Sequence, residues 1–484
     1  MARPPSEIPR VNRMVYASGS IAGNVLSRST ALWLVFFFAP PSGETDLPTL
    51  VPRVALGFMI VGITLIDSID DPLIGFWSDR TQTRWGRRIP FVLFSTPVYA
   101  VTFALMWFPP GGEAGHFANA IYFFFFVWLH RLFSTLSGGP FESLLPEIAR
   151  TPQSRVSIVA WQVGFGAVGA GIGLGVTGFI IDASSFQVMG ITMAAIAFTS
   201  RYIALAGAWR YARRDVPPVR ANPVRAFRDT FRNDQFRCFL PTFVLFNMAV
   251  TMLTAAFPFY AAVVLLGGFP EKIASLETGS VAQLHLFGAE IGLGLGLLVG
   301  LLTSVAILAV LLSLPLVYRL SLLKGKAWVY STAMLMSALG YPLLFFMGFL
   351  PGVPVMTQSL VFVALAGLPM AAVFTFPNAI IADIIDYDEV RTGMRREAIY
   401  YGSQATIEKW ATSLFAPILA LVLLLGETAD NPLGIRLVGP VAGVAALIGY
   451  LLFRGYRLPD QVNAESVRQA GLRVEEPEPA ADLG

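Results

Sequence analysis

Three aspartates stand close together in a segment that is otherwise apolar, DSIDDPLIGFWSDRTQTRWGRR at residues 67–88. On a helix, Asp67 and Asp71 are separated by one turn and Asp70 lies beside them, so all three face the same side. A carboxylate in hydrocarbon costs roughly 2.5 to 3.5 kcal/mol, and like charges at this spacing repel each other. We therefore expect a cation site for H⁺ or Na⁺, with Asp67 and Asp71 as the metal ligands if the ion is Na⁺. The alternative is pairing with basic residues at the end of the helix, which applies mainly to Asp70.

A lysine lies inside another apolar segment. Lys409 follows Glu408 in TIEKWATSLF, and adjacent residues point about 100° apart on a helix, so the two cannot fully neutralise each other. We expect Lys409 to face a cavity and to meet a carboxylate or an anionic group of a substrate. The alternative is that Lys409 interacts only with its sequence neighbour Glu408. Trp410 could stack on a sugar ring, although aromatic residues are also common at membrane interfaces.

Arginines inside apolar segments are open to two interpretations. Arg28 and Arg201 either line a cavity or pair with an acid for packing reasons. Arg28 is the stronger candidate for substrate binding, because it shares its segment with Asn24. We expect Asn24 to bind substrate as well. Arg131 is expected to meet an acid of the first or second membrane span.

The composition identifies the class of protein that must position these residues. Of the 484 residues, 55% are hydrophobic and 13% are charged, and the mean hydropathy is +0.64. A soluble globular protein is excluded by these values. The single cysteine, Cys238, excludes an intrachain disulfide and a zinc cluster of cysteines. The first residues, MARPPSEIPR, have no apolar core, so we expect no cleavable signal peptide.

The apolar segments predict an all-α membrane protein with twelve spans. About 20 apolar residues are needed for each crossing. The predicted spans are residues 16–39, 54–77, 89–108, 118–145, 156–181, 187–211, 239–266, 289–318, 327–350, 357–382, 398–425 and 435–453.

Basic residues are concentrated in every second connection between spans. Examples are Arg80, Arg84, Arg87 and Arg88 after span two, the arginines of residues 213–237 after span six, and Arg391, Arg395 and Arg396 after span ten. The positive-inside rule therefore places both termini in the cytoplasm. We expect a multi-pass protein of the cell (inner) membrane. The net charge of +3 reflects this topology and gives no reason to expect nucleic acid as a partner.

The longest basic connection divides the chain into two halves. We predict an N-terminal six-helix bundle at residues 1–211, a cytoplasmic basic linker at 212–238, a C-terminal six-helix bundle at 239–453 and a disordered cytoplasmic tail at 454–484. Part of the linker has the arginine spacing of an amphipathic helix on the inner leaflet. DRTQTRWGRR after span two and YRLSLLKGK after span eight form a weak internal echo, although the positive-inside rule alone would also produce such loops. The layout is that of the major facilitator fold, with two pseudo-symmetric bundles and substrate near the midplane.

Three stretches resemble the glycoside–pentoside–hexuronide:cation symporter family, which includes the melibiose permease. They are DSIDDPLIGFWSDRTQTRWGRRIPF at 67–91, ADIIDYDEVRTGMRREAIYYGSQATIEKW at 382–410 and GGPFESLLPE at 138–147. The resemblance implies cation-coupled symport of a sugar or glycoside by alternating access. It also implies a cation site formed by Asp67, Asp71 and Thr135, and a lysine near these acids at Lys409.

The chain departs from this family at the sugar site. Val25 stands where the family has a sugar-holding aspartate, and Gly138 where the melibiose permease has a third acid. Gln162 replaces a sugar-contacting arginine, and Glu142 replaces a tryptophan on which the sugar packs. The resemblance thus implies that the coupling site is kept while the sugar site is altered, with Glu142 and Gln162 as candidate substrate-binding residues. Glu142 could instead supply the missing carboxylate, one turn from Gly138, or belong to the cytoplasmic end of its span beside Glu147.

Opposite charges in two cytoplasmic loops predict an inner gate. The residues are Asp79, Arg84, Arg87 and Arg88 after span two, and Asp386, Arg395 and Arg396 after span ten. The alternative is that these groups form solvated ion pairs, each worth less than ~1 kcal/mol.

Two other functions are weighed against sugar symport. Lysophosphatidylcholine symporters resemble this chain in keeping the helix-two acids and the helix-eleven lysine without the sugar-holding aspartate, so the substrate could be a lysophospholipid or another amphiphile whose phosphate meets Lys409. A membrane-embedded lipid-modifying enzyme would need a catalytic acid in an aqueous loop, and we find no such loop and no Walker A motif.

We therefore expect a transporter rather than an enzyme, driven by an ion gradient and without a cofactor. The coupling ion is expected to be H⁺ or Na⁺, and because Gly138 stands where a relative has a carboxylate, we expect H⁺ in preference to Na⁺. The expected partners are a small-molecule substrate and membrane lipids, with the protein acting as a monomer.

Overall fold

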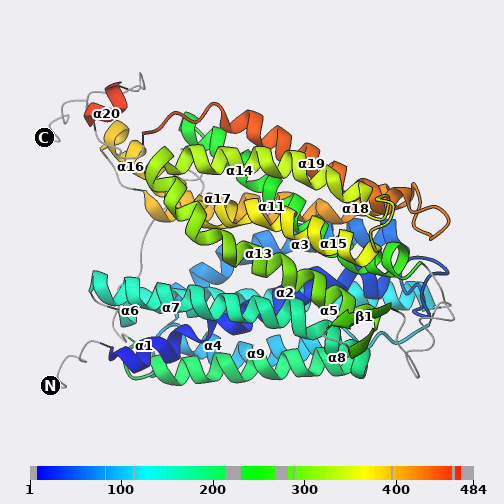
Figure 1. Cartoon of the computed structure of the whole chain (residues 1–484). Coiled ribbons are helices and arrows are strands. Elements are labelled where there is room, and N and C mark those ends of the chain that lie inside the picture. The colour runs from blue at the N-terminus through cyan, green and yellow to red at the C-terminus, as the bar shows by residue number, and fades with distance from the viewer. Residues whose placement is uncertain are drawn as a thin grey trace, which may run out of the picture. The chain divides into compact units, whose positions relative to one another are not determined.

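The computed structural model describes residues 8–81, 83–112, 115–149, 151–212, 230–267, 282–286, 289–393, 396–459 and 464–469 (Figure 1). Within these residues, ten helices are long and apolar enough to cross a membrane. Two further helices, α3 (Arg53–Arg80) and α4 (Ile89–Leu105), lie where spans two and three are predicted. The prediction of an all-α membrane protein is therefore confirmed for the membrane-spanning segments.

The first half of the chain forms helices at each predicted span. In chain order they are α1 (Arg10–Ala17), α2 (Ser20–Phe38), α3, α4, α5 (His116–Ser143), α6 (Leu145–Ile148), α7 (Pro152–Gly171), η2 (Ile172–Val176), α8 (Thr177–Ala183) and α9 (Phe186–Ala208). Span five is made of α7, the π-helical turn η2 and α8 in succession. Thr151 caps the start of α7, because its side chain accepts a hydrogen bond from the Ser154 backbone N–H.

The second half is also helical, with one exception. Its elements are α11 (Asp234–Tyr260), η3 (Ala261–Leu265), β1 (Ala282–Leu286), β2 (Ala289–Leu293), α13 (Leu295–Lys324), α14 (Lys326–Gly340), η5 (Tyr341–Phe346), α15 (Val355–Thr375), α16 (Pro377–Thr392), α17 (Glu397–Ser413), α18 (Phe415–Leu423), α19 (Leu433–Phe453) and α20 (Ala464–Gln469). The short helix α20 lies within the tail that the sequence predicts to be disordered. The amphipathic helix predicted in the linker falls mainly on residues 213–229, which lie outside the described residues.

The start of span eight differs from the prediction. Residues 289–293 form strand β2, which pairs antiparallel with β1, and the helix α13 begins only at Leu295. An apolar run alone does not distinguish strand from helix, and glycines at 288, 292 and 294 weaken the helical alternative. The predicted span of 289–318 is therefore about six residues too early at both ends.

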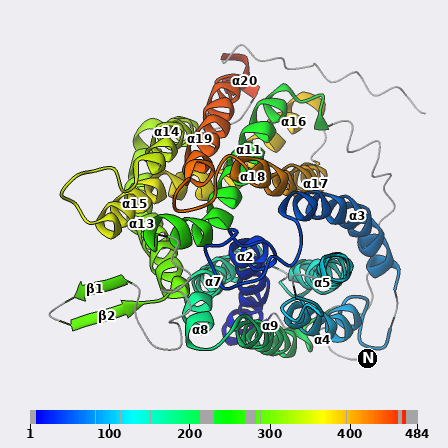
Figure 2. The ribbon, with the colours of Figure 1, turned by 90° about the vertical axis from the view of Figure 1, so that its right-hand side faces the viewer.

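The helices group into two compact units. The first unit comprises Met1–Arg220, Thr254–Ser304 and Ala416–Ile435. The second comprises Ala221–Leu253, Val305–Phe415 and Arg436–Gly484. In the first unit α2 packs against α7 and α9, while α4 packs against α5 and α9 (Figure 2). In the second unit α14 packs against α15, and α16 against α17.

Candidate functional site

Asp67 is the most deeply enclosed of the predicted cation ligands that the structure describes. Its side chain is 2% exposed on α3, and its Oδ2 lies 3.8 Å from Nη1 of Arg131 on α5. This separation is an ion pair and is longer than an N–H···O hydrogen bond. The expectation that Arg131 meets an acid of span one or two is therefore confirmed. Asp70 is half-buried on the same helix, and the Asp71 side chain lies outside the described residues.

One face of α5 carries further predicted site residues. Arg131, Thr135 and Glu142 are separated by four and seven residues, so they lie along one side of the helix. Because Arg131 contacts Asp67, this side of α5 is the one that faces Asp67 of α3. Thr135, one turn from Arg131, is half-buried there, which is compatible with its predicted role as a cation ligand.

Glu142 and Gln162, which stand where the resemblance places sugar contacts, lie together. Gln162 Nε2 on α7 donates a hydrogen bond of 3.2 Å to Glu142 Oε2 on α5. The Glu142 side chain is exposed, whereas Glu147 is buried and belongs to a different cluster. Glu142 lies in the last turn of α5 and Glu147 in α6 just beyond it, so the alternative that Glu142 belongs to the end of its span stays open. A carboxylate and an amide held side by side offer several acceptors and a donor for hydroxyl groups.

Arg201 is more deeply buried than Arg28, the other arginine that could either line a cavity or pair with an acid. It is 4% exposed on α9, and its Cζ lies 4.2 Å from the ring centroid of Phe141. Its Nε and Nη1 have no hydrogen-bond partner among the residues that the structure describes. Phe141 itself is held by Tyr16, whose hydroxyl donates 2.6 Å to the Phe141 carbonyl. A buried guanidinium with unmatched donors is costly, and its presence calls for a role. Arg28 is only half-buried on α2.

Asn24 has a packing role that the sequence did not indicate. Its Nδ2 donates 2.9 Å to the Ser20 carbonyl of its own helix. A methyl group on Gly166 of α7 would lie 3.1 Å from this same nitrogen. Asn24 thus fills the space that the glycines of α7 leave open, and part of its hydrogen-bonding capacity is already used.

Two of the arginines after span two converge on one buried acid. Glu147 is 4% exposed, and its Oε1 lies 2.8 Å from Arg87 Nε and 3.0 Å from Arg88 Nε. Arg84 is exposed and stacks on Trp85, with its Cζ 4.7 Å from the ring centroid. Sequence reasoning treated Glu147 only as a neighbour of Glu142, because the residues that pair with it are about 60 positions earlier.

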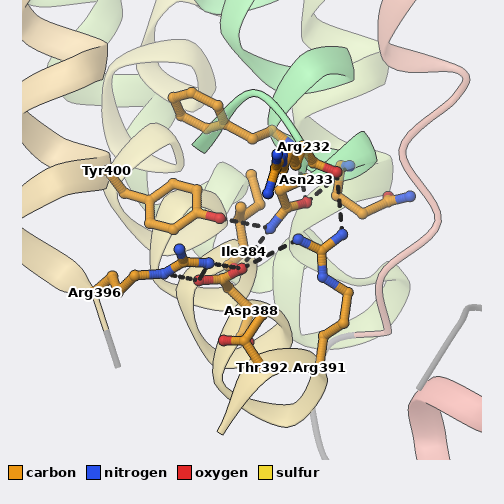
Figure 3. A network of polar contacts seen from close by, with 10 residues as sticks. Arg232, Asn233, Ile384, Asp388, Arg391, Thr392, Arg396 and Tyr400 are labelled. Atoms are coloured by element: carbon orange, nitrogen blue, oxygen red, sulfur yellow. Dashed lines mark hydrogen bonds and ion pairs between the residues drawn. The ribbon is translucent and has the colours of Figure 1, made fainter. Parts of the chain in front are cut away.

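The predicted gate after span ten contains a buried network centred on Asp388 (Figure 3). Asp388 is fully buried and accepts hydrogen bonds of 2.8 Å from both Nε and Nη2 of Arg396. Arg391 approaches the same carboxylate at 3.5 Å and donates 3.1 Å to the carbonyl of Arg232. Such a bidentate pair is shielded from solvent, so the alternative of solvated ion pairs does not describe Arg396. Asp386 is half-buried nearby in sequence, and Arg395 lies outside the described residues, as does the side chain of Asp79.

The same network joins three helices of the second unit. Asn233 at the start of α11 donates 3.3 Å to the Ile384 carbonyl of α16 and 3.0 Å to the Tyr400 hydroxyl of α17 (Figure 3). Sequence reasoning missed Asp388, Asn233 and Tyr400. The only available signal was the density of acids in DIIDYDEV, which does not reveal which acid faces inward.

Each half of the chain has a similar pair at the start of its third span. Lys326, at the start of α14, lies 2.6 Å from Asp383 of α16, just as Arg87 and Arg88 before α4 pair with Glu147 after α5. Spans three and nine occupy the same position in their respective halves, and so do spans four and ten. The sequence echo between residues 79–88 and 318–326 thus has a structural counterpart.

Lys409 and Trp410 lie on α17 in the second unit. Lys409 is half-buried and Trp410 is 44% exposed. The predicted approach of Lys409 to the acids of α3 stays a prediction. Among the side chains that the structure describes, which exclude Asp71, no group of three or more His, Cys, Asp or Glu is placed to hold a metal ion.

Comparison with known proteins shows which family the chain belongs to. The sequence matches the family described as MFS/sugar transport protein over residues 15–278 and 272–431. The inner membrane symporter YicJ of Escherichia coli (strain K12) is 25% identical over 58% of this chain, and the match spans 60% of that protein. The glucuronide carrier protein homolog of Escherichia coli (strain K12) is 25% identical over 93% of both chains. The sodium-dependent lysophosphatidylcholine symporter 1 of Gallus gallus is 29% identical over 28% of this chain and 25% of that protein.

Solved structures show the same fold at much lower identity. The crystal structure of the peptide transporter POT in complex with sulfate has a TM-score of 0.61 and 14% identity, and covers 92% of this chain and 93% of that chain. A mutant of the nucleoside transporter NupG has a TM-score of 0.61 and 11% identity, and covers 92% and 99%. The expected twelve-helix major facilitator fold and the expected transporter class are thereby confirmed. The chain is a multi-pass membrane transporter that belongs to the MFS/sugar transport protein family.

Proposed function

We propose that the protein is a symporter of the cell's inner membrane, which moves a sugar or glycoside together with H⁺ or Na⁺ by alternating access. The observation that carries this proposal is the ion pair between the buried Asp67 on α3 and the partly exposed Arg131 on α5. Arg131 compensates the charge of Asp67 while no ion is bound, and a proton or Na⁺ at Asp67 competes with it. Because the two groups lie on different helices, ion binding then biases how α5 sits against α3.

The proposed orientation has both termini in the cytoplasm. It is supported by the arginines at 84–88 and 391–396, since basic loops stay on the cytoplasmic side. The protein acts as a monomer in contact with membrane lipids, because the major facilitator fold contains its whole substrate path in one chain.

Glycosides are the favoured substrate class. The glucuronide carrier homolog matches over 93% of this chain, so the similarity extends through both halves. The Glu142–Gln162 pair supplies acceptors and a donor for sugar hydroxyls at the positions where the resemblance places sugar contacts.

A lysophospholipid is the second candidate substrate. It is supported by the match to a lysophosphatidylcholine symporter and by the absence of a sugar-holding aspartate at Val25. In this case Lys409 would pair with the phosphate of the substrate.

Substitution of Lys409 separates the two substrate classes. Ligand affinity is measured by thermal shift for wild type and Lys409→Gln, at fixed pH and Na⁺, with neutral glycosides, glucuronides and lysophosphatidylcholine. Stabilisation follows RT ln(1 + [L]/Kd), about 2.7 kcal/mol at 100 times Kd. For a neutral glycoside, Lys409→Gln should change the affinity little. For a lysolipid it should weaken binding roughly tenfold to a hundredfold, because a charge-assisted hydrogen bond is lost.

Lys324→Gln is the matched control, because Lys324 is exposed at the end of α13 and stacks on Trp328 at 5.9 Å. If wild type binds neither class, both substrate proposals are wrong. A strict Na⁺ requirement for binding at constant pH would overturn the preference for H⁺.

A further inference from the structure

Asp182, at the end of α8, caps a helix that belongs to the other half of the chain. Its Oδ1 accepts a hydrogen bond of 2.7 Å from the Gly296 N–H, and its Oδ2 one of 2.6 Å from the Leu297 N–H. Both donors lie in the first turn of α13, where backbone N–H groups lack partners within the helix. A negative charge is also favourable at this end of the helix dipole. One carboxylate thus ties span five to span eight.

Beside this cap, the two spans touch backbone to backbone. A methyl group on Gly178 of α8 would collide with the carbonyl of Gly296, and one on Gly300 would lie 2.7 Å from the carbonyl of Gly175. Thr303, which is 2% exposed, donates 2.9 Å to the Leu174 carbonyl. Glycine at these positions allows an approach that side chains would prevent.

A second contact of the same kind joins span two to span eleven. A methyl group on Gly57 of α3 would lie 2.8 Å from Cα of Pro417 in α18. Arg53 at the start of α3 forms an ion pair with Glu427. Nearby, Glu44 is 6% exposed and accepts 2.6 Å from the Ala429 N–H. In both contacts, close backbone packing therefore occurs beside a charged side chain that links the two spans.

The contact of Gly57 lies at the opposite end of α3 from the arginine-rich loop after span two. Arg53 and Gly57 are at the beginning of α3, and the loop with Arg87 and Arg88 follows its end at Arg80. A helix of this length spans roughly 40 Å at 1.5 Å per residue. If the arginine loops are cytoplasmic, the Asp182 cap lies at the outer side of the membrane.

We propose that Asp182 is an outer latch of the transport cycle. As a positioning residue, it holds span five against the first turn of span eight, and this cap breaks and re-forms each time the substrate path opens outward. Water at the membrane edge replaces the two hydrogen bonds when the spans part, so the lock is reversible. The inference rests on the proposed transport function and orientation.

The test measures how often the contact opens. Cys238→Ser removes the native thiol, and Thr303→Cys places a reporter thiol inside the contact. A membrane-impermeant maleimide is then applied to right-side-out vesicles and, separately, to inside-out vesicles. Asp182→Asn should raise the labelling rate from the outside roughly tenfold, because a charge-assisted cap is lost. Asp182→Glu should restore part of the slow labelling.

Two matched controls separate latching from general destabilisation. Ser185→Ala, three residues on, removes a cap that serves only its own helix α9, where the Val188 N–H donates 3.3 Å. Gly178→Ala should open the contact sterically, whereas Gly171→Ala should not, because a methyl group there meets no atom within 4 Å. Thermal unfolding of each variant accompanies the labelling.

The outcomes distinguish the latch from the proposals on which it rests. Faster outside labelling in Asp182→Asn and Gly178→Ala, with both controls unchanged, supports the latch. Equal rates in all variants overturn it. Faster labelling from the inside-out side alone overturns the outer assignment and contradicts the proposed orientation. The readout needs no substrate, so a wrong substrate class leaves the test intact.

Discussion

At the scale of single residues, Asp67 and Arg201 are both buried charged groups, but their surroundings differ. Asp67 is buried with a compensating charge 3.8 Å away, while Arg201 is buried against an aromatic ring with unmatched donors. A compensated charge can exchange its partner for an ion. A buried guanidinium with unmatched hydrogen-bond donors is retained at a cost and should be needed for function.

The first prediction concerns coupling. Asp67→Asn should abolish accumulation driven by an ion gradient while substrate exchange continues, because an amide cannot hold the ion but leaves the substrate contacts in place. Uptake and counterflow in proteoliposomes measure the two activities separately. Asp46→Asn, an exposed aspartate between α2 and α3, should retain both. Full uphill transport by Asp67→Asn would contradict the assignment.

The second prediction concerns Arg201. Each unmatched donor costs about 1–3 kcal/mol, and the contact with Phe141 returns about 0.5–2 kcal/mol. Because Arg201 has two such donors, Arg201→Met should raise the free energy of unfolding by roughly 3 kcal/mol while transport falls. Thermal unfolding and uptake assays measure the two effects.

Arg436→Met is the control for this result. Arg436 lies in α19, and its Nη1 donates 2.9 Å and 2.6 Å to the carbonyls of Phe345 and Met347. Because these hydrogen bonds are lost, Arg436→Met should lower stability. A loss of stability in both variants would show that Arg201 has only a structural role.

At the scale of helices, hydropathy located each span but not where its helix ends. The helix of span ten continues through α16 to Thr392, because DIIDYDEVRT is charged yet remains helical outside the membrane. Span eight starts late because its glycine-rich beginning forms β2. The sequence also did not reveal which aspartate of α16 pairs with which residue, because such pairs depend on how the helices pack. Asp383, Asp386 and Asp388 all lie in one short helix, and only the packing of α11 and α17 determines that Asp388 is enclosed.

The third prediction follows from that enclosure. Asp388→Asn leaves Arg396 buried without its full counter-charge, which should cost about 3–5 kcal/mol. Asp430→Asn, in the exposed connection before α19, should cost almost nothing. The double variant Asp388→Asn with Arg396→Gln should recover part of the loss, because the two residues are coupled. Thermal unfolding in detergent gives all three values, and equal stability of Asp388→Asn and wild type would contradict the network.

At the scale of the whole molecule, the regularity of charge along the chain predicted the class of fold before any contact was known. Spans and basic loops are local features, so the sequence reveals them. The pairs Arg131–Asp67 and Arg87–Glu147 join residues about 60 positions apart, and single-sequence reasoning has no measure of such distances beyond charge complementarity. The expectation for Arg131 succeeded because an arginine inside a membrane span needs an acid. Nothing comparable pointed to Asp182.

The fourth prediction tests the orientation of the whole chain. A green fluorescent protein fused after Gly484 should fluoresce, and alkaline phosphatase fused at the same place should be inactive, because the C-terminus is proposed to be cytoplasmic. Alkaline phosphatase fused after Asp46 should be active, since that connection precedes α3 on the opposite side. The reversed pattern would invert the proposed topology.

The π-helical turn η2 (Ile172–Val176) lies between α7 and α8. A π turn contains one residue more than the corresponding α turn. Removing one residue from the regular helix α8 would rotate everything beyond it by about 100° about the helix axis, and Asp182 would then point away from the first turn of α13. Removing one residue from η2 would instead close the wide turn to an ordinary α turn, because the π turn already contains the extra residue. Span five can therefore lose a residue at η2 while the carboxylate six residues further on still faces its partner.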